Sequence, residues 1–136
     1  MAKYHQYVFD AKKRAFVGKF EEMYAREGRD NYDSWFQEDL SGLKYVISTA
    51  VLGQYNFDRV LDIGCGKGAF THLLKKKNNS VLGVDISKTA IRKARAKYPH
   101  IDFRALAAED ILSLRKKYDL VVAMEILSYL KTWPAV

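Results

Sequence analysis

The chain has 136 residues, the size of one domain, and 49% of them are hydrophobic, which is sufficient for a core. A single cysteine excludes an internal disulfide and a zinc cluster. The first residues, Met1–Gln6, lack the apolar stretch of a secretory signal, and no window approaches the roughly 18 consecutive apolar residues of a membrane span. We therefore expect a cytoplasmic protein with no membrane partner.

The formal net charge of +7 raises the question of nucleic-acid binding. The basic residues are dispersed, and the two densest groups, 75–77 and 92–97, fall near the expected C-terminal ends of helices, where cations complement the helix dipole. Neither group has the interleaved aromatic residues that stack on bases. We therefore expect solvated helix faces and no nucleic-acid partner.

Two amphipathic segments at the N-terminus are predicted to be helices that pack beside a sheet. The first ends near Gly28, and the second stops around Gly53. The apolar residues at helical spacing in the first are Phe9, Phe16, Phe20, Met23 and Tyr24, and those in the second are Leu40, Leu43, Ile47, Ala50 and Val51. Together they predict an N-terminal helical cap over residues 1–54. Between them, Tyr32 and Trp35 are expected to anchor a polar loop to the core.

From Arg59 onward, strand-like and helix-like segments alternate. The predicted strands are 59–63, 80–85, 101–106 and 118–124, and the predicted helices are 68–77, 88–98 and 109–116. Ser87 is expected to cap the second of these helices and Pro99 to end it. Such alternation requires a parallel sheet with right-handed crossovers and helices on both faces, which is an α/β fold.

The most informative motif is the run Val60–Gly68, in which a buried strand breaks into three glycines at alternate positions, preceded by Asp62. Glycine lets the backbone adopt angles that other residues resist and lets a ligand approach without interference from a Cβ atom. Helix-forming residues 69–74 follow at once, so that the N–H groups of a helix start face the ligand. The run therefore predicts a turn that cradles a nucleotide.

A second strand ends in Asp85, 21 residues after Gly64, which is the interval at which a carboxylate meets ribose hydroxyls in a βαβ nucleotide site. Asp85 is expected to accept hydrogen bonds from both ribose hydroxyls. The alternative is a carboxylate that caps the next helix through its own loop.

The glycine spacing separates two ligand classes. Dinucleotide sites have G-x-G-x-x-G, whereas this chain has D-x-G-x-G-x-G, beginning at Asp62. The latter pattern resembles motif I of the class I S-adenosylmethionine-dependent methyltransferases. The resemblance continues through Asp85 and through Tyr118–Leu130, which looks like the fourth strand and following loop of that family, and covers about residues 55–130.

The resemblance implies a Rossmann-like, doubly wound parallel sheet with strand order 3-2-1-4, in a cofactor-binding core over residues 55–136. It implies methyl transfer from S-adenosylmethionine to oxygen, nitrogen or carbon of a small metabolite, sugar or natural-product precursor. The cofactor-binding residues that it implies are Asp62, Gly64, Cys65, Gly66, Gly68, Asp85, Ile86, Glu109 and Asp110. No metal is expected, because the three histidines lack ligand spacing.

Some of these roles have structural alternatives. The family often places an acid against the adenine amino group at the position of Ala107, so Glu109 or Asp110 is the candidate here, unless both are first-turn carboxylates of the next helix. Ile86 is expected to pack on the adenine ring or in the core. Cys65 has no recognisable histidine partner and is expected to fill space in the turn rather than act as a nucleophile.

At the acceptor end, Glu125, Ser128 and Tyr129 follow the fourth strand, where the transferring methyl group should lie, and Glu125 and Tyr129 are the catalytic candidates. A helix-start role for Glu125 is the alternative. In this family the N-terminal helices often cover the substrate pocket, so that Tyr32 and Trp35 are also candidate lid residues.

The chain stops after the fourth strand, whereas the family continues with about three more strands. We therefore expect a fragment that binds cofactor weakly, transfers no methyl group alone, and self-associates through the edge strand 119–124 unless its own C-terminal helix covers it. Two rival functions stay open. One is an NAD(P)-dependent oxidoreductase, which the glycine spacing and Asp62 disfavour, and the other is a non-catalytic cofactor-binding fragment.

Overall fold

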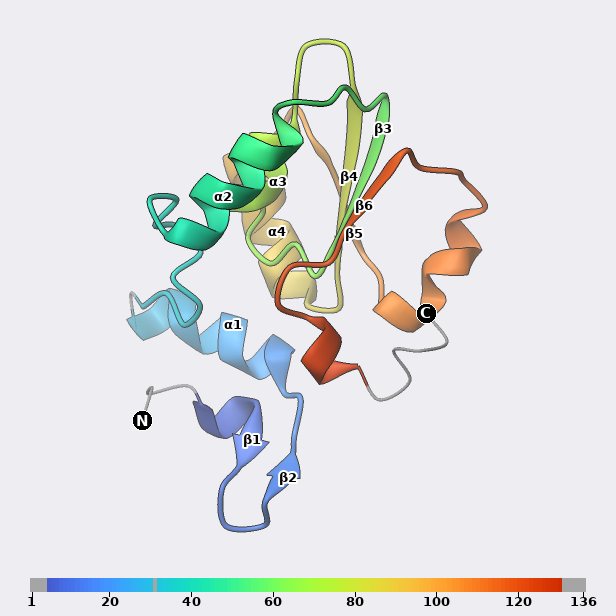
Figure 1. Ribbon diagram of the computed structural model, residues 1–136. Helices are drawn as coiled ribbons and strands as arrows, with labels where there is room; N and C mark the ends of the chain where they lie inside the picture. The colour runs from blue at the N-terminus through green and yellow to red at the C-terminus, as the bar shows by residue number, and fades with distance from the viewer. Residues whose placement is uncertain (1–4, 31, 131–136) are drawn as a thin grey trace.

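A four-stranded parallel sheet forms the centre of the computed structural model, which describes residues 5–30 and 32–130 (Figure 1). Its strands, in spatial order, are β5 (Asp102–Ala105), β4 (Ser80–Asp85), β3 (Arg59–Ile63) and β6 (Leu120–Val122). Val60 of β3 pairs with Val81 on one side and with Leu120 on the other. The predicted α/β class and the strand order 3-2-1-4 are confirmed. The expectation of a fragment rests on the end of the chain, and residues 131–136 lie outside the described residues.

Two helices connect these strands on one face. They are α3 (Ala69–Leu74) and α4 (Lys88–Lys97), and Ser87 caps α4 as predicted, since its hydroxyl accepts a hydrogen bond from Ala90 N at 3.1 Å. α3 is shorter than the predicted helix 68–77. The cause is Asn79, whose side chain donates to Leu74 O at 2.9 Å and accepts from Lys76 N at 2.8 Å, so that it satisfies main-chain groups where the helix ends.

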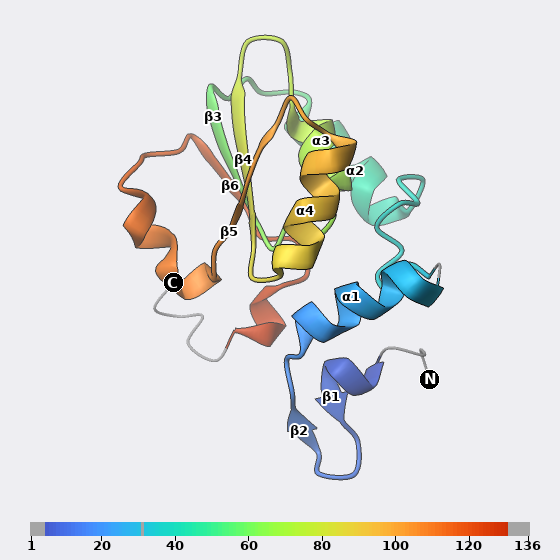
Figure 2. The same ribbon diagram turned by 180° about the vertical axis from the view of Figure 1, so that it is seen from behind.

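Alternation along the strands places the buried residues of the sheet in two clusters, one on each face. Val60, Val81 and Phe103 face α3 and α4, whereas Leu61 and Val84 face the other side. Figures 1 and 2 show α2, α3 and α4 on one face. The opposite face is covered by residues of 106–126, including the 3₁₀ helix η2 (Ala108–Leu114), where an α-helix over 109–116 was predicted. The strands predicted over 101–106 and 118–124 are likewise shorter than expected.

The first predicted N-terminal helix is wrong over its first half. Residues 5–18 form a 3₁₀ turn, η1 (His5–Tyr7), and an antiparallel hairpin of β1 (Phe9–Asp10) and β2 (Ala15–Phe16). Asp10 explains the turn, because its carboxylate accepts from Lys12 N and Lys13 N, each at 3.0 Å. The helix that does form is α1 (Phe20–Asp30), which buries Met23 and Tyr24 as predicted.

The second N-terminal helix, α2 (Leu43–Leu52), forms as predicted but turns a different face to the core. Tyr45 is buried, with its ring 5.6 Å from the ring of Phe70 on α3. Most of the apolar residues predicted to pack against the sheet are exposed instead, namely Leu43, Ile47, Ala50 and Val51. The aromatic contact sets the rotation of the helix, and helical periodicity alone could not choose between the two faces.

The N-terminal hairpin and α1 lie beyond the end of the sheet at which β3 and β4 stop (Figures 1 and 2). In open parallel sheets, ligands bind outside the carboxyl ends of the strands, where the order of connection reverses. Here that point lies at β3, which has β4 on one side and β6 on the other. No helix in the described part of the chain combines the length and apolarity that a membrane crossing needs.

Candidate functional site

A cavity of about 820 Å³ opens at the carboxyl ends of β3 and β4. Its walls come from the glycine-rich loop, the ends of β4 and β6, α1 and the loop that follows it, and the 3₁₀ turn η3 (Leu127–Tyr129). The predicted site residues on its walls are Asp62, Gly64, Cys65, Asp85, Ile86, Glu109, Glu125, Ser128 and Tyr129. Gly66, Gly68 and Asp110 do not line it. The structure therefore brings together most of the residues predicted from four separate stretches of the sequence.

The three glycines of the loop all have positive φ angles, of 72° at Gly64, 53° at Gly66 and 82° at Gly68. A Cβ atom at Gly64 would collide with the side chain of Ile126, and one at Gly68 would lie 2.6 Å from the ring of Phe103. Other atoms do approach Gly64 and Gly68 closely, as predicted, but these atoms belong to side chains of the protein and not to a ligand.

Asp85 uses both carboxylate oxygens within the protein. One accepts from Gly66 N at 2.9 Å, and the other accepts from Ser87 N at 2.8 Å, which is the loop contact that the alternative interpretation anticipates. A carboxylate has about four acceptor sites, so these two bonds leave capacity for hydroxyl groups in the cavity. Burial raises the pKa of Asp85, and the bonds from Ser87 and Gly66 oppose that rise.

Asp62 is 3% exposed and lies beneath the loop, where it accepts a hydrogen bond from the Thr71 hydroxyl at 2.7 Å. Burial raises the pKa of Asp62 to about 7, against the opposing effect of Thr71, and the charge of Asp85 adds to the rise. A positively charged group in the cavity would favour the ionised form. Asp62 is therefore suited to a cationic ligand.

Around the expected adenine pocket, the structure separates several alternatives. Ile86 is 60% exposed and lines the cavity, so the core role is wrong. Glu109 lines the cavity and Asp110 does not. Cys65 is buried, and burial raises the pKa of its thiol well above the ordinary value, which opposes a nucleophilic thiolate and agrees with the predicted filling role.

The far end of the cavity is aromatic and carries an ion pair. Glu125 has a φ of 57° and pairs with Lys44 at 2.6 Å, while η3 begins after Ile126 without a side-chain cap, so the helix-start role for Glu125 is not seen. The ring of Tyr129 lies 5.7 Å from Phe20 and 5.8 Å from Trp35.

Trp35 has both of the roles considered for it. It packs, like Tyr32, against the buried cluster of Val8, Met23, Tyr24 and Ala90, as expected for a loop anchor. It also lines the cavity, as expected for a lid residue.

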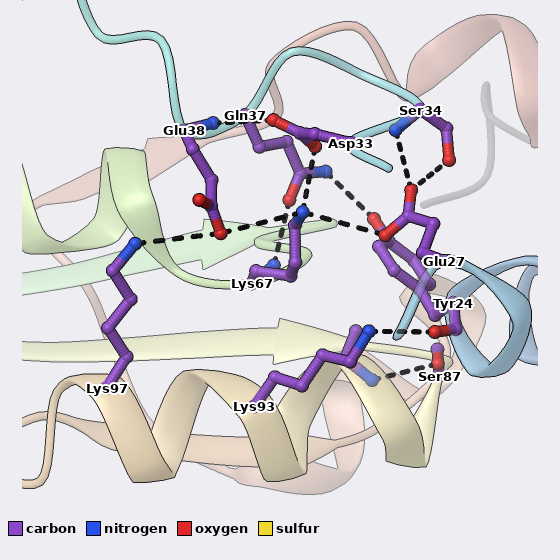
Figure 3. Close-up of polar contacts among 11 residues, drawn as sticks. Tyr24, Glu27, Asp33, Ser34, Gln37, Glu38, Lys67, Ser87, Lys93 and Lys97 are labelled. Carbon is purple, nitrogen blue, oxygen red and sulfur yellow. Dashed lines mark hydrogen bonds and ion pairs between the residues drawn. The ribbon is translucent and has the colours of Figure 1, made fainter. Parts of the chain in front are cut away.

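The residue that sequence reasoning missed is Lys67, in the middle of the glycine-rich loop. Its ammonium group lies 2.8 Å from Asp33, 3.6 Å from Glu27 and 3.8 Å from Glu38, all of which follow the start of α1 in the chain (Figure 3). Burial lowers the pKa of Lys67, but the hydrogen bond to Asp33 and the neighbouring carboxylates outweigh this effect and raise it overall. One feature of the sequence could have indicated this contact: residues 20–40 are strongly acidic, whereas the chain as a whole is basic, so a lysine elsewhere could pair with them.

Comparison with known proteins identifies relatives of this arrangement. A family model described as a methyltransferase domain matches residues 60–136. Over 88 residues the chain is 34% identical to a putative methyltransferase 235L of Invertebrate iridescent virus 6, covering 61% of this chain and 33% of that protein. Over 75 residues it is 40% identical to a ubiquinone biosynthesis O-methyltransferase of Bradyrhizobium diazoefficiens, covering 52% of this chain and 29% of that protein. The chain thus spans about a third of the length of these curated relatives.

Solved structures show the same likeness. The N-methyltransferase NodS from Bradyrhizobium japonicum WM9, in complex with S-adenosyl-L-homocysteine, is similar with a TM-score of 0.64 and 25% identity, over 85% of this chain and 61% of that chain. DesVI of Streptomyces venezuelae has a TM-score of 0.60 at 23% identity, over 74% of this chain and 47% of that one, and shows the fold alone.

Among the described residues, no group of three or more His, Cys, Asp or Glu is arranged to hold a metal ion.

Proposed function

Because the chain belongs to the methyltransferase domain family, we propose that it binds S-adenosylmethionine in the cavity and transfers the methyl group of this cofactor to a small molecule. The family match confirms the resemblance seen in the glycine motif. S-adenosylmethionine as the cofactor is supported by the same match and by NodS, which was solved with S-adenosyl-L-homocysteine. The match also speaks against the NAD(P)-dependent alternative.

The observation that carries the proposal is the convergence of Asp62, Asp85 and the Gly64 turn on one cavity. We assign the ribose hydroxyls to Asp85, which keeps free acceptor sites, and the positively charged methionine end to Asp62. Ile86 is placed to cover the adenine ring, because it is apolar, exposed and on the cavity wall. Glu109, rather than Asp110, is the candidate for the adenine amino group.

The bound cofactor supplies a methyl group already activated by its attachment to a sulfonium. What the chain must supply is mainly position, since holding a nucleophile in line can lower a barrier by about 7–11 kcal/mol. We propose that Glu125 and Tyr129 contact the acceptor. Where the acceptor must lose a proton, Glu125 is the candidate to take it, and Lys44 holds the Glu125 carboxylate in place. The names of two relatives, an O-methyltransferase and an N-methyltransferase, give oxygen and nitrogen as accepting atoms in those proteins.

Ligand binding to the 136-residue chain tests the proposal. S-adenosyl-L-homocysteine should raise the melting temperature, by a stabilisation of about 2.7 kcal/mol at 100 times its dissociation constant, and NAD should not. Asp85→Asn should weaken binding by about 1.5–3 kcal/mol in calorimetry, the range for a hydrogen bond to a charged group.

Asp110→Asn is the matched control, because Asp110 does not line the cavity, and its affinity should equal that of the wild type. Equal affinity of wild type and Asp85→Asn would remove Asp85 from the site. Binding of S-adenosyl-L-homocysteine without methyl transfer to any acceptor would favour the alternative of a non-catalytic cofactor-binding fragment.

We further propose a division into an N-terminal cap, residues 1–54, and a cofactor-binding core, residues 55–136, in a cytoplasmic protein without a nucleic-acid partner. Self-association through residues 119–124 remains part of the proposal. Val121 supports it, since its side chain is 54% exposed on β6, and β6 pairs only with β3 among the described strands. Light scattering at increasing concentration tests this surface.

A further inference from the structure

One wall of the cavity comes from a segment whose net charge is opposite to that of the rest of the chain. Residues 20–40, here called the acidic segment, carry seven carboxylates and two arginines, in a chain whose net charge is +7. The segment contributes Phe20, Tyr24, Trp35 and Gln37 to the cavity lining. A ligand in the cavity therefore lies between the glycine-rich loop and uncharged side chains of the acidic segment.

Lys67 joins this wall to the glycine-rich loop by both its main chain and its side chain (Figure 3). Its N–H donates to the Gln37 side-chain oxygen at 2.9 Å, and the Gln37 amide nitrogen donates to the Tyr24 hydroxyl at 2.8 Å. Its ammonium group donates to Asp33 at 2.8 Å and pairs with Glu27 at 3.6 Å. The preceding Gly66 leaves room for Gln37, because a Cβ atom there would collide with the Gln37 amide.

The other contacts of the segment with the core are both apolar and polar, since Met23 and Tyr24 are buried in one cluster with Ala90 of α4. Glu21 accepts from the hydroxyls of Ser87 and Thr89, both at 2.6 Å, and Lys93 donates to Tyr24 O at 2.8 Å. Lys67 and Lys93 differ in burial. Lys67 is 7% exposed and is the one buried lysine in the described part of the chain.

Glu27 is a buried carboxylate that pairs with the buried Lys67. It is 2% exposed, and one of its oxygens accepts from Ser34 N at 2.7 Å. Its other oxygen has no hydrogen-bond partner among the described residues and pairs with the ammonium group of Lys67 at 3.6 Å. Removing that charge would leave the buried carboxylate without its ion-pair partner, and the carboxylate could regain water if the segment moved away from the loop.

We infer that Lys67 is a positioning residue that holds the acidic segment against the glycine-rich loop and so keeps the cavity wall in place for the cofactor. The part that concerns the cofactor rests on the proposed function. The part that concerns the segment rests on the contacts of Lys67, Glu27, Asp33 and Gln37 alone.

Hydrogen–deuterium exchange on the full chain, followed by mass spectrometry, tests the segment without any ligand. Lys67→Met keeps most of the aliphatic stem and removes the charge, and exchange in residues 20–40 should become about tenfold faster or more, while residues 59–63 and 80–85 keep their protection. Asp33→Asn removes the negative charge that lies 2.8 Å from Lys67, without altering the glycine-rich loop, and should act in the same direction.

Lys97→Met is the matched control, because Lys97 is half-exposed and its ion pair, at 3.7 Å, is with the exposed Glu38. It should leave exchange unchanged, and Lys67→Arg, which keeps the charge, should restore protection relative to Lys67→Met. Calorimetry with S-adenosyl-L-homocysteine should show affinity about tenfold weaker in Lys67→Met than in the wild type, because fewer molecules have the wall in place.

The outcomes separate the two proposals. Unchanged exchange in residues 20–40 of both Lys67→Met and Asp33→Asn would overturn the inference, as would equal ligand affinity of Lys67→Met and the wild type. Loss of protection throughout β3 and β4 in both variants would also overturn it, since the role would then be general stability. A wild type that binds no S-adenosyl-L-homocysteine would overturn the proposed function, and the exchange result would still decide the role of Lys67.

Discussion

The glycine-rich loop has two neighbours that hold it by different forces. On the side of the sheet, Phe103 is 1% exposed, and its ring packs where Gly68 and Gly83 leave space, so the contact is apolar and closely fitted. On the side of the acidic segment, the contacts are the ion pairs and hydrogen bonds of Lys67, with Met23 and Tyr24 adding apolar contact to Ala90.

This difference bears on which parts of the cavity can move. Separating the sheet from its helices would expose a large apolar cluster, so that face unfolds only with the whole domain. Separating the acidic segment exposes a smaller apolar cluster, of Val8, Met23, Tyr24 and Ala90, together with the charged groups that water solvates well. We therefore expect one wall of the cavity to be as stable as the fold and the other to open more easily.

The largest expected effect comes from breaking the apolar side. Phe103→Ala should lower the free energy of unfolding by about 3–5 kcal/mol, because a buried ring is lost and a cavity is left at the centre of the main cluster. Denaturant unfolding followed by circular dichroism measures it. Leu112→Ala, at a position 87% exposed, should change this free energy by less than about 0.5 kcal/mol.

A second comparison uses the same substitution in the two regions. Gly66→Ala should destabilise by about 1–2 kcal/mol, because Gly66 has a φ of 53° and Gln37 must move. Gly28→Ala, inside α1, should instead stabilise by about 0.5–1 kcal/mol, since the new Cβ atom meets only the flexible end of Lys93, at 3.3 Å. Opposite signs in thermal melts are expected, and equal signs would contradict the assignment of strain to the loop.

The third prediction concerns Asp62, beneath the loop. Its pKa of about 7 means that it holds a proton below that pH, and a cationic ligand favours the ionised form. The affinity for S-adenosylmethionine should therefore rise with pH, by about tenfold between pH 6 and pH 8, as the ionised fraction rises. Calorimetry in buffers of different ionisation enthalpy should show proton release on binding at pH 6.

Asp62→Asn is the control for this titration, because an amide keeps a hydrogen-bonding group beside Thr71 and has no proton to release. Its affinity should be weaker and independent of pH in this range. A pH dependence retained in Asp62→Asn would assign the titration to another group.

The sequence predicted the βαβ part of the fold closely, and physical reasons explain why. The bounds of β3 and β4 match the predicted strands 59–63 and 80–85, because a short, mainly apolar run bounded by glycine or aspartate leaves few alternatives. Ser87 marked the start of α4 by a local hydrogen bond. The candidate site residues Asp62 and Asp85 were predicted at strand ends by the same motif, and the structure places both on the cavity wall.

The N-terminal part was harder because its structure depends on distant contacts. Aromatic residues at helical spacing suggested one helix through Phe9 and Phe16, but local bonds to the Asp10 carboxylate favour a hairpin. The orientation of α2 depends on Tyr45 meeting Phe70, 25 residues later. Lys67 was missed because its partners lie 29 to 40 residues earlier in the chain, and charge spacing along a sequence does not show which charges meet.

The two edge strands of the sheet, β5 and β6, differ in how well nearby side chains protect them from pairing with another strand. At β5, Arg95 donates two hydrogen bonds to the Phe103 carbonyl, at 2.9 and 2.6 Å, and Asp102 pairs with Arg104. These charged side chains oppose the addition of another strand. At β6, no described side chain bonds to the main chain of the strand, so we expect any further strand, from this chain or from a second copy, to pair with β6 and extend the sheet on the side away from β5.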